Sequence, residues 1–202
     1  MNLRPELPTA ENSSNFNVVP NSTTTVGTTL ENLKAAVCGE TGASAKYALY
    51  AKVAKEQGFD QLSRLWEAAS AAEQVHINLE ARLVEAEDPT YVRPTAPEAQ
   101  PAAVDLNLID SANGEIHETS DMYPSFIKKA QEEGKDEAVK VFTRAKLAES
   151  VHAEKYLEAY NNIDAADDDA YYVCPGCGYI HKGDDFEKCP ICGAPKQVFK
   201  KF

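Results

Sequence analysis

The chain has 202 residues, of which 43% are hydrophobic, with 20 lysines and arginines against 32 aspartates and glutamates. This apolar content suffices for one medium-sized domain and a small module, which excludes a wholly disordered chain. The net charge of −12 opposes binding to nucleic acid. No run of about 18 apolar residues is available for a membrane span, so we expect no membrane partner. Residues 1–10 lack the apolar core of a secretory signal, and we therefore expect a cytoplasmic protein.

Four long segments carry the 3.6-residue hydrophobic period of amphipathic helices. A polar N-terminal extension over residues 1–27 shows no sustained period, and helices are then expected over residues 28–57, 60–88, 105–133 and 135–162. Pro124 predicts a kink in the third helix because it removes a backbone donor. Four prolines between residues 89 and 101 favour a long extended connection between the second and third helices. The pattern predicts an all-α four-helix bundle of the ferritin-like kind over residues 28–163.

Each predicted helix carries ionisable side chains in the middle of its apolar stripe. Two of these are Glu-x-x-His pairs, whose spacing places carboxylate and imidazole on one helix face. Single glutamates occur at matching heights on the other two helices, within about one turn at ~1.5 Å per residue. Buried carboxylates without compensation cost several kcal/mol, so this cluster requires cations. Oxygen and imidazole ligands suit iron or manganese, and the pattern is typical of di-iron or di-manganese carboxylate proteins. The predicted ligands are Glu40, Glu73, His76, Glu115, Glu149 and His152.

Two further residues lie near this cluster in the sequence. Glu118 follows Glu115 by three residues and lies on the same helix face, so it is either a further ligand or a surface residue. Five ionised carboxylates outweigh the charge of two ferrous ions but not that of two ferric ions. A ligand that binds only the oxidised metals would follow this change in charge. Cys38 is expected to be a small buried hydrophobic residue rather than a nucleophile.

The C-terminal region contains two Cys-x-x-Cys pairs separated by eleven residues. Such pairs hold one tetrahedral ion through four thiolates, and a glycine behind each pair allows a tight turn. Zinc and iron both suit this geometry, but beside a redox-active bundle a one-electron iron centre would be useful as an electron donor. We expect an acidic linker over residues 164–170 and a metal module over residues 171–202, with ligands Cys174, Cys177, Cys189 and Cys192.

Over about residues 28–202 the chain resembles the rubrerythrin family, and most of all its nigerythrin branch. The resemblance rests on the segments GETGASAKY, AAEQVH, ANGEIHETSDMYPSF, LAESVHAEKY and CPGCGYIHKGDDFEKCPICG. It implies a ferritin-like di-iron domain followed by a rubredoxin-like domain. The implied activity is that of a non-haem di-iron peroxidase that reduces hydrogen peroxide to water. Electrons would come from a pyridine nucleotide through a separate reductase or a rubredoxin.

The resemblance also implies roles for individual residues. Two iron ions would occupy the bundle and a third the four-cysteine site, where zinc substitution is an alternative. Glu118 and His76 would exchange at the first iron, the carboxylate binding the oxidised and the imidazole the reduced metal. Tyr47 and Tyr123 would hydrogen-bond ligating carboxylates, for which core packing is the alternative. In the bundle, the two irons would be bridged by Glu73 and Glu149, one would be bound by Glu40, and the other by Glu115 with His152.

The last predicted helix continues for ten residues beyond His152, or about 15 Å. On this basis the Cys module begins far from the di-iron site of its own chain. We therefore predict, as the resemblance also suggests, that electrons pass between the subunits of a head-to-tail homodimer. Two other classes of function remain open. One is a ferroxidase or iron-storage protein, which leaves the Cys module without use, and the other is a non-enzymatic protein with zinc in both sites.

Overall fold

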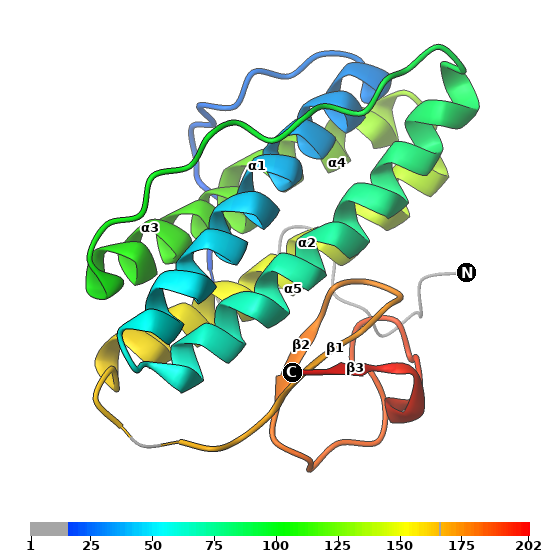
Figure 1. The fold of residues 1–202 in the computed structure, drawn as a ribbon. Coiled ribbons are helices and arrows are strands. Elements are labelled where there is room, and N and C mark those ends of the chain that lie inside the picture. Colours follow the sequence, from blue (N-terminus) through cyan, green and yellow to red (C-terminus); the bar gives the residue numbers. More distant parts are fainter. Residues whose placement is uncertain (1–15, 166) are drawn as a thin grey trace.

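The computed structural model describes residues 16–165 and 167–202, and it confirms the helical bundle with a small C-terminal module (Figure 1). A capping box between Thr28 and Glu31 starts the first helix. The extended connection between the second and third predicted helices runs back along the length of the bundle (Figure 1). The bundle helices are α1 (Thr29–Glu56), α2 (Asp60–Glu87), α3 (Val104–His117), α4 (Tyr123–Glu132) and α5 (Asp136–Asn161).

The third predicted helix is divided by a π-helical turn rather than only kinked at Pro124. This turn, η1 (Glu118–Met122), separates α3 from α4, and the Tyr123 amide donates to the Glu118 carbonyl five residues back. Pro124 then falls in the first turn of α4, directly after the π-turn, where its missing N–H leaves the Ser120 carbonyl without its usual helical donor. The break thus precedes the proline and begins at a predicted ligand, which agrees with the frequent occurrence of π-turns at functional sites.

The bundle core consists of aromatic and small apolar side chains around Trp66. This indole is fully buried, lies 5.6 Å from the Tyr50 ring centroid, and donates to Ser111 Oγ at 3.0 Å. Tyr171, Val173 and other apolar side chains of the C-terminal module belong to the same hydrophobic cluster. The module and the bundle therefore share part of one core.

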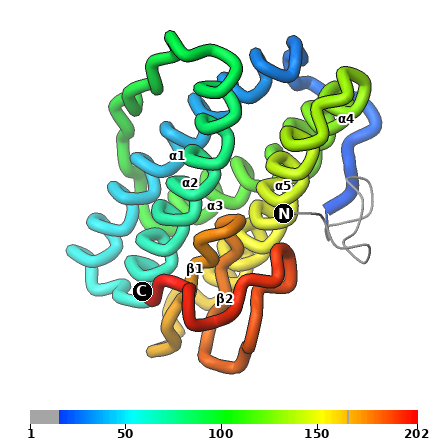
Figure 2. Tube along the Cα trace, turned by 90° about the vertical axis from the view of Figure 1, so that its right-hand side faces the viewer, coloured from blue at the N-terminus to red at the C-terminus, as the bar shows by residue number. Residues whose placement is uncertain are grey.

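The C-terminal module is a small antiparallel sheet whose strands, in spatial order, are β2 (Ile180–Lys182), β1 (Tyr171–Val173) and β3 (Lys200–Lys201). The chain folds back after α5, so that the sheet lies beside α2 and α5 of its own bundle (Figures 1 and 2). Asp167 fixes this linker: it contacts Lys182 of the module, and it accepts hydrogen bonds from Gln61 and Arg64 of α2 at 2.8 and 2.7 Å. In the described part of the chain no helix is long and apolar enough to cross a membrane. The module also contains a 3₁₀ turn, η2 (Lys196–Val198).

Candidate metal centres

The six predicted ligands of the bundle converge at its centre, and none of them is more than 1% exposed. They come from α1, α2, α3 and α5, so the four-helix arrangement brings together residues that are far apart in sequence. Their ligand atoms form two groups, each with all atoms within 4.8 Å of one another: Glu40, Glu73, His76 and Glu149 in one, and Glu73, Glu115, Glu149 and His152 in the other.

Glu73 and Glu149 belong to both groups. Glu149 Oε1 lies 2.7 Å from His76 Nδ1, and its Oε2 lies 2.8 Å from His152 Nδ1. Glu73 is placed in the same way, with Oε2 3.0 Å from His76 Nδ1 and Oε1 3.6 Å from His152 Nδ1. Each of these carboxylates thus offers one oxygen to each side, which is the arrangement that a bridging ligand of two cations requires.

Hydrogen bonding tests whether these residues fit a pair of metal ions, because atoms that bind a metal need no other hydrogen-bond partner. Among the described residues, several deeply buried oxygen and nitrogen atoms make no hydrogen bond, although they lie close together. Buried polar atoms are nearly always hydrogen-bonded, so a set of orphaned atoms aimed at one place fits bound cations. These atoms are Glu40 Oε2, both oxygens of Glu73 and Glu149, Glu115 Oε2, and Nδ1 of His76 and His152.

The same crowding moves the pKa values of the cluster. Burial, together with neighbouring carboxylates, raises the pKa of Glu40 and Glu115 well above the usual range. Burial alone would lower the pKa of His152, but Glu149 outweighs it and the pKa rises to about 9; that of His76 rises for the same reason. The two imidazoles in turn outweigh burial and hold the pKa of Glu149 below its usual value. Without cations the cluster therefore retains protons, and metal ions would displace them.

Both cluster histidines also contact the Cys module. His76 Nε2 lies 3.0 Å from the carbonyl oxygen of Cys177, and His152 Nε2 lies 2.9 Å from that of Gly178. A carbonyl only accepts, so each Nε2 carries the proton and donates, which leaves each Nδ1 free to bind a metal. Such backbone contacts orient ligating imidazoles in metalloproteins.

Gly178 permits this close approach. Its φ is +76°, and a Cβ at this position would overlap His76 Nε2 and lie 2.9 Å from Cδ2 of the same ring. Any larger residue would force the module away from the histidine. The sequence predicted a turn glycine here but not the contact between the two sites.

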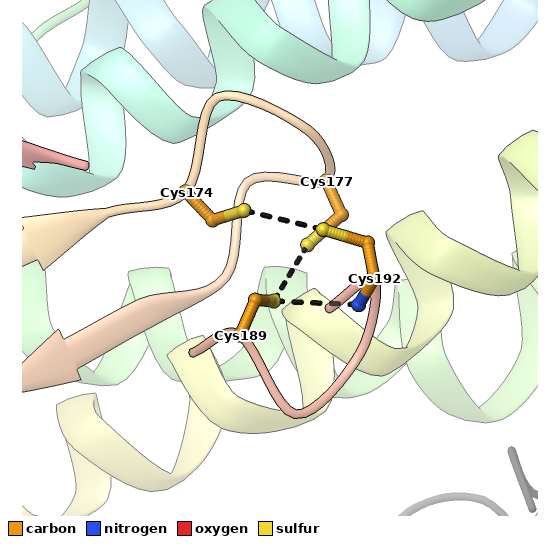
Figure 3. A group of neighbouring side chains, drawn as sticks. All are labelled: Cys174, Cys177, Cys189 and Cys192. Carbon is orange, nitrogen blue, oxygen red and sulfur yellow. Dashed lines mark hydrogen bonds between the residues drawn. The ribbon is translucent and has the colours of Figure 1, made fainter. Parts of the chain in front are cut away.

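The four predicted cysteines come together in the C-terminal module (Figure 3). Their sulfur atoms point toward one another, with Cys174 and Cys192 Sγ 3.4 Å apart and Cys177 and Cys189 Sγ also 3.4 Å apart. Four converging thiols fit one tetrahedral ion. Cys192 is the partly exposed member of the set, whereas the other three are buried.

Tyr47 and Tyr123 both donate to carboxylates of the cluster. Tyr47 Oη donates to Glu115 Oε1 at 2.7 Å, and Tyr123 Oη contacts Glu40 Oε1. Tyr123 Oη also donates to Glu80 Oε1 at 2.9 Å. Glu80 is a fully buried carboxyl that is not among the ligands predicted from the sequence. Burial raises the pKa of Glu80 to about 8. Glu80 lies four residues after His76 on the same helix face, a spacing that many solvated glutamates share.

Glu118 lies at the edge of the cluster. It is partly exposed and stands outside both metal groups, although its carboxyl hydrogen-bonds that of Glu115. Burial, followed by the charges of Glu149 and Glu73, raises its pKa well above the usual range. The structure thus brings Glu118 to the site without placing it among the ligand atoms that converge.

Two expectations require correction. Cys38 is exposed, because Val37 and Glu40 face the core and the intervening position turns outward. The premise that the Cys module begins far from its own di-iron site is also wrong. The linker reverses direction after α5 and brings the Cys177 carbonyl to His76 of the same chain. A homodimer is therefore not required for contact between the two sites.

Comparisons with known proteins agree with this arrangement. Residues 31–160 match the family described as Rubrerythrin, and residues 172–200 match the rubrerythrin rubredoxin-like domain. The chain is 62% identical to nigerythrin of Nitratidesulfovibrio vulgaris strain Hildenborough, with full coverage of both chains. It is 34% identical to rubrerythrin of the same organism, over 85% of this chain and 93% of that one. Solved structures of nigerythrin in fully reduced, all-ferrous and in mixed-valence states cover both chains fully, with TM-scores of 0.93 and 0.91 and identities of 62% and 63%.

Proposed function

Because this chain belongs to the rubrerythrin family, we propose that it is a di-iron peroxidase that reduces hydrogen peroxide to water. Each turnover would consume one peroxide, two electrons and two protons and yield two water molecules. The observation that carries the proposal is the contact of both cluster histidines with backbone carbonyls of the Cys module. A buried carboxylate cluster joined to a one-electron centre is suited to reductive chemistry. Iron storage would leave this contact without use.

In this proposal the chain's own residues hold the metals and exclude water. Glu73 and Glu149 would bridge the two ions, and the remaining ligands would be Glu40 on one side and Glu115 with His152 on the other. Glu118 and His76 would serve as alternative ligands on the Glu40 side, the carboxylate for the oxidised and the imidazole for the reduced metal. The chemistry that a ferrous pair would supply in this site is the two-electron reduction of peroxide. Tyr47 and Tyr123 would orient the carboxylates that they contact.

Electrons would return to the cluster singly through the Cys module. Cys177 is both a predicted iron ligand and the residue whose carbonyl accepts from His76, so the route needs one hydrogen bond between the two sites. The partly exposed Cys192 is the side at which an external donor would approach. That donor would be a reductase supplied by a pyridine nucleotide, or a rubredoxin.

We expect the fully reduced protein to reoxidise much faster with hydrogen peroxide than with dioxygen. The measurement is anaerobic stopped-flow absorbance of the iron in the Cys module after mixing with each oxidant at equal concentration. A ferroxidase would show the opposite preference and would take up more than three irons per chain. A faster reaction with dioxygen would therefore overturn the proposed activity.

We further expect electrons to pass within one chain. Two inactive variants provide the test, one with Cys189 and Cys192 replaced by serine and the other with Glu73 and Glu149 replaced by glutamine. Mixed and refolded together, they should regain no peroxide turnover, because every intact module then belongs to a chain without an intact cluster. Recovery toward a quarter or more of wild-type activity would show transfer between subunits and restore the head-to-tail homodimer.

A further inference from the structure

The segment formed by residues 16–27, here called the N-terminal strap, lies against the π-helical turn that begins at Glu118. The Val19 amide donates to the Ser120 carbonyl at 2.9 Å. The Thr23 amide and hydroxyl both donate to Asp121 Oδ2, at 2.9 and 2.8 Å, and the Ser22 hydroxyl donates to Asp121 Oδ1. Neither the metal sites nor the proposed electron route uses these contacts.

The strap supplies a donor that the helix lacks. In an α-helix the Ser120 carbonyl would accept from the amide of residue 124, which is proline and has no N–H. Val19 provides the missing amide from outside the helix. A buried carbonyl without a partner is costly, so this bond stabilises the turn at the point where Pro124 weakens it.

Asp121 is the second point of attachment. Its side chain is 4% exposed, and an ionised carboxylate at such a position needs hydrogen-bond donors. Burial alone would raise the pKa of Asp121, but the bonds from Ser22 and Thr23 outweigh it and hold the pKa below the usual value. Asp121 is therefore ionised, and its bonds to the strap are of the strong, charge-assisted kind.

The turn is held from its other side as well. The Thr119 hydroxyl donates to the Lys146 carbonyl of α5 at 3.0 Å. The strap and α5 thus enclose η1 between them. A π-turn contains an extra residue relative to an α-helix, so its conformation sets the direction of the side chains at both of its ends. Those ends are Glu118 and, directly after the turn, Tyr123.

We propose that the N-terminal strap, acting through Asp121, positions Glu118 for the di-metal site. Asp121 is then a positioning residue: it touches no predicted ligand atom but fixes the turn from which Glu118 projects. This inference rests on the proposed function only in taking the carboxylate cluster as a metal site. It gives the strap a role in metal binding as well as in stability.

The experiment compares Asp121→Asn with a strap variant, Ser22→Ala with Thr23→Val, which leaves η1 itself unchanged. Asp110→Asn is the matched control, since Asp110 is an exposed carboxylate of α3 that accepts from Tyr50 and pairs with Lys46. In the metal-free protein, hydrogen exchange of the amides of residues 118–123 should rise about tenfold or more in both test variants. Exchange around Glu73 on α2 should stay unchanged, as should all exchange in the control.

The second measurement is anaerobic titration of each metal-free protein with ferrous iron. The ferrous affinity of both test variants should match that of the wild type, because His76 rather than Glu118 would bind the reduced metal. After oxidation, both should lose iron to a chelator roughly tenfold faster than the wild type, a loss typical of outer support for ligands. After oxidation, their near-ultraviolet and visible spectra should differ from those of the wild type and the control. Unchanged exchange, or faster exchange with unchanged iron retention and unchanged spectra after oxidation, would overturn the proposal. Failure of the wild-type protein to bind iron at the carboxylate cluster would instead overturn the proposed function.

Discussion

Replacing Gly178 by alanine is expected to slow peroxide turnover on the order of 10²-fold while both metal sites still bind iron. The new Cβ would overlap His76 Nε2, so the module must move away by about 1 Å before the contact is tolerable. That movement breaks the hydrogen bond between His76 and the Cys177 carbonyl, on which the proposed electron route depends. The measurement is the rate at which the reduced iron of the Cys module reoxidises after peroxide is added.

Gly193→Ala is the matched control for this substitution. Gly193 follows the second Cys-x-x-Cys pair as Gly178 follows the first, and its φ is +78°. Apart from its two neighbours in the chain, none of the described residues has an atom within 4 Å of the position that its Cβ would occupy. The control thus carries the same backbone strain without the collision. Equal slowing in both variants would assign the effect to strain, and normal reoxidation in Gly178→Ala would exclude the contact as the electron route.

The metal-free protein is expected to lose stability as pH rises from about 5 to about 9. The raised pKa values of Glu40, Glu115 and Glu80 mean that these groups hold protons in the folded state that they release when unfolded above their ordinary pKa of 4.5. The histidines act in the same direction, because the contribution of His152 is present below 6.5 and is lost as pH rises through about 9. The low pKa of Glu149 has the opposite effect, but only below pH 4.5.

Chemical denaturation of the metal-free protein across this range would measure the effect as a fall of a few kcal/mol in the free energy of unfolding. Metal-loaded protein should show a much smaller slope, because the cations have already displaced the protons. Glu80→Gln offers a control, since a neutral amide in that buried position removes one titrating group and should flatten part of the slope. A free energy of unfolding that increases with pH in the metal-free protein would contradict the conclusion that the folded cluster retains protons.

The bundle and the cluster were predictable because both follow from periodicity along single helices. Apolar stripes set the helix positions to within a few residues, and two Glu-x-x-His pairs at matching heights fixed the centre of the site. Glu80 lay on the same stripe but was one glutamate among many. Nothing in its spacing from His76 distinguished a buried acid from a solvated one before the position of Tyr123 was known.

The remaining features depend on contacts between distant segments. The π-turn at Glu118 is completed by Val19, which lies far earlier in the sequence, and no local pattern announces such a partner. The direction of the linker depends on Asp167 meeting Gln61 and Arg64 of α2. An acidic, loosely patterned stretch indicates the length of the linker but not its direction. The helix extension beyond His152 therefore predicts a separation that the folded chain does not have.

The fold-back of the linker also affects how the molecule behaves on dilution. Because residues 164–170 tether the Cys module to the bundle on which it docks, the module meets His76 at a high effective concentration that does not depend on how much protein is present. Electron delivery between the two centres, as proposed, would then be a first-order event in each molecule. On the proposed route, only the encounters with peroxide and with the external donor would be bimolecular, so turnover per molecule at fixed concentrations of both would stay constant as the enzyme is diluted.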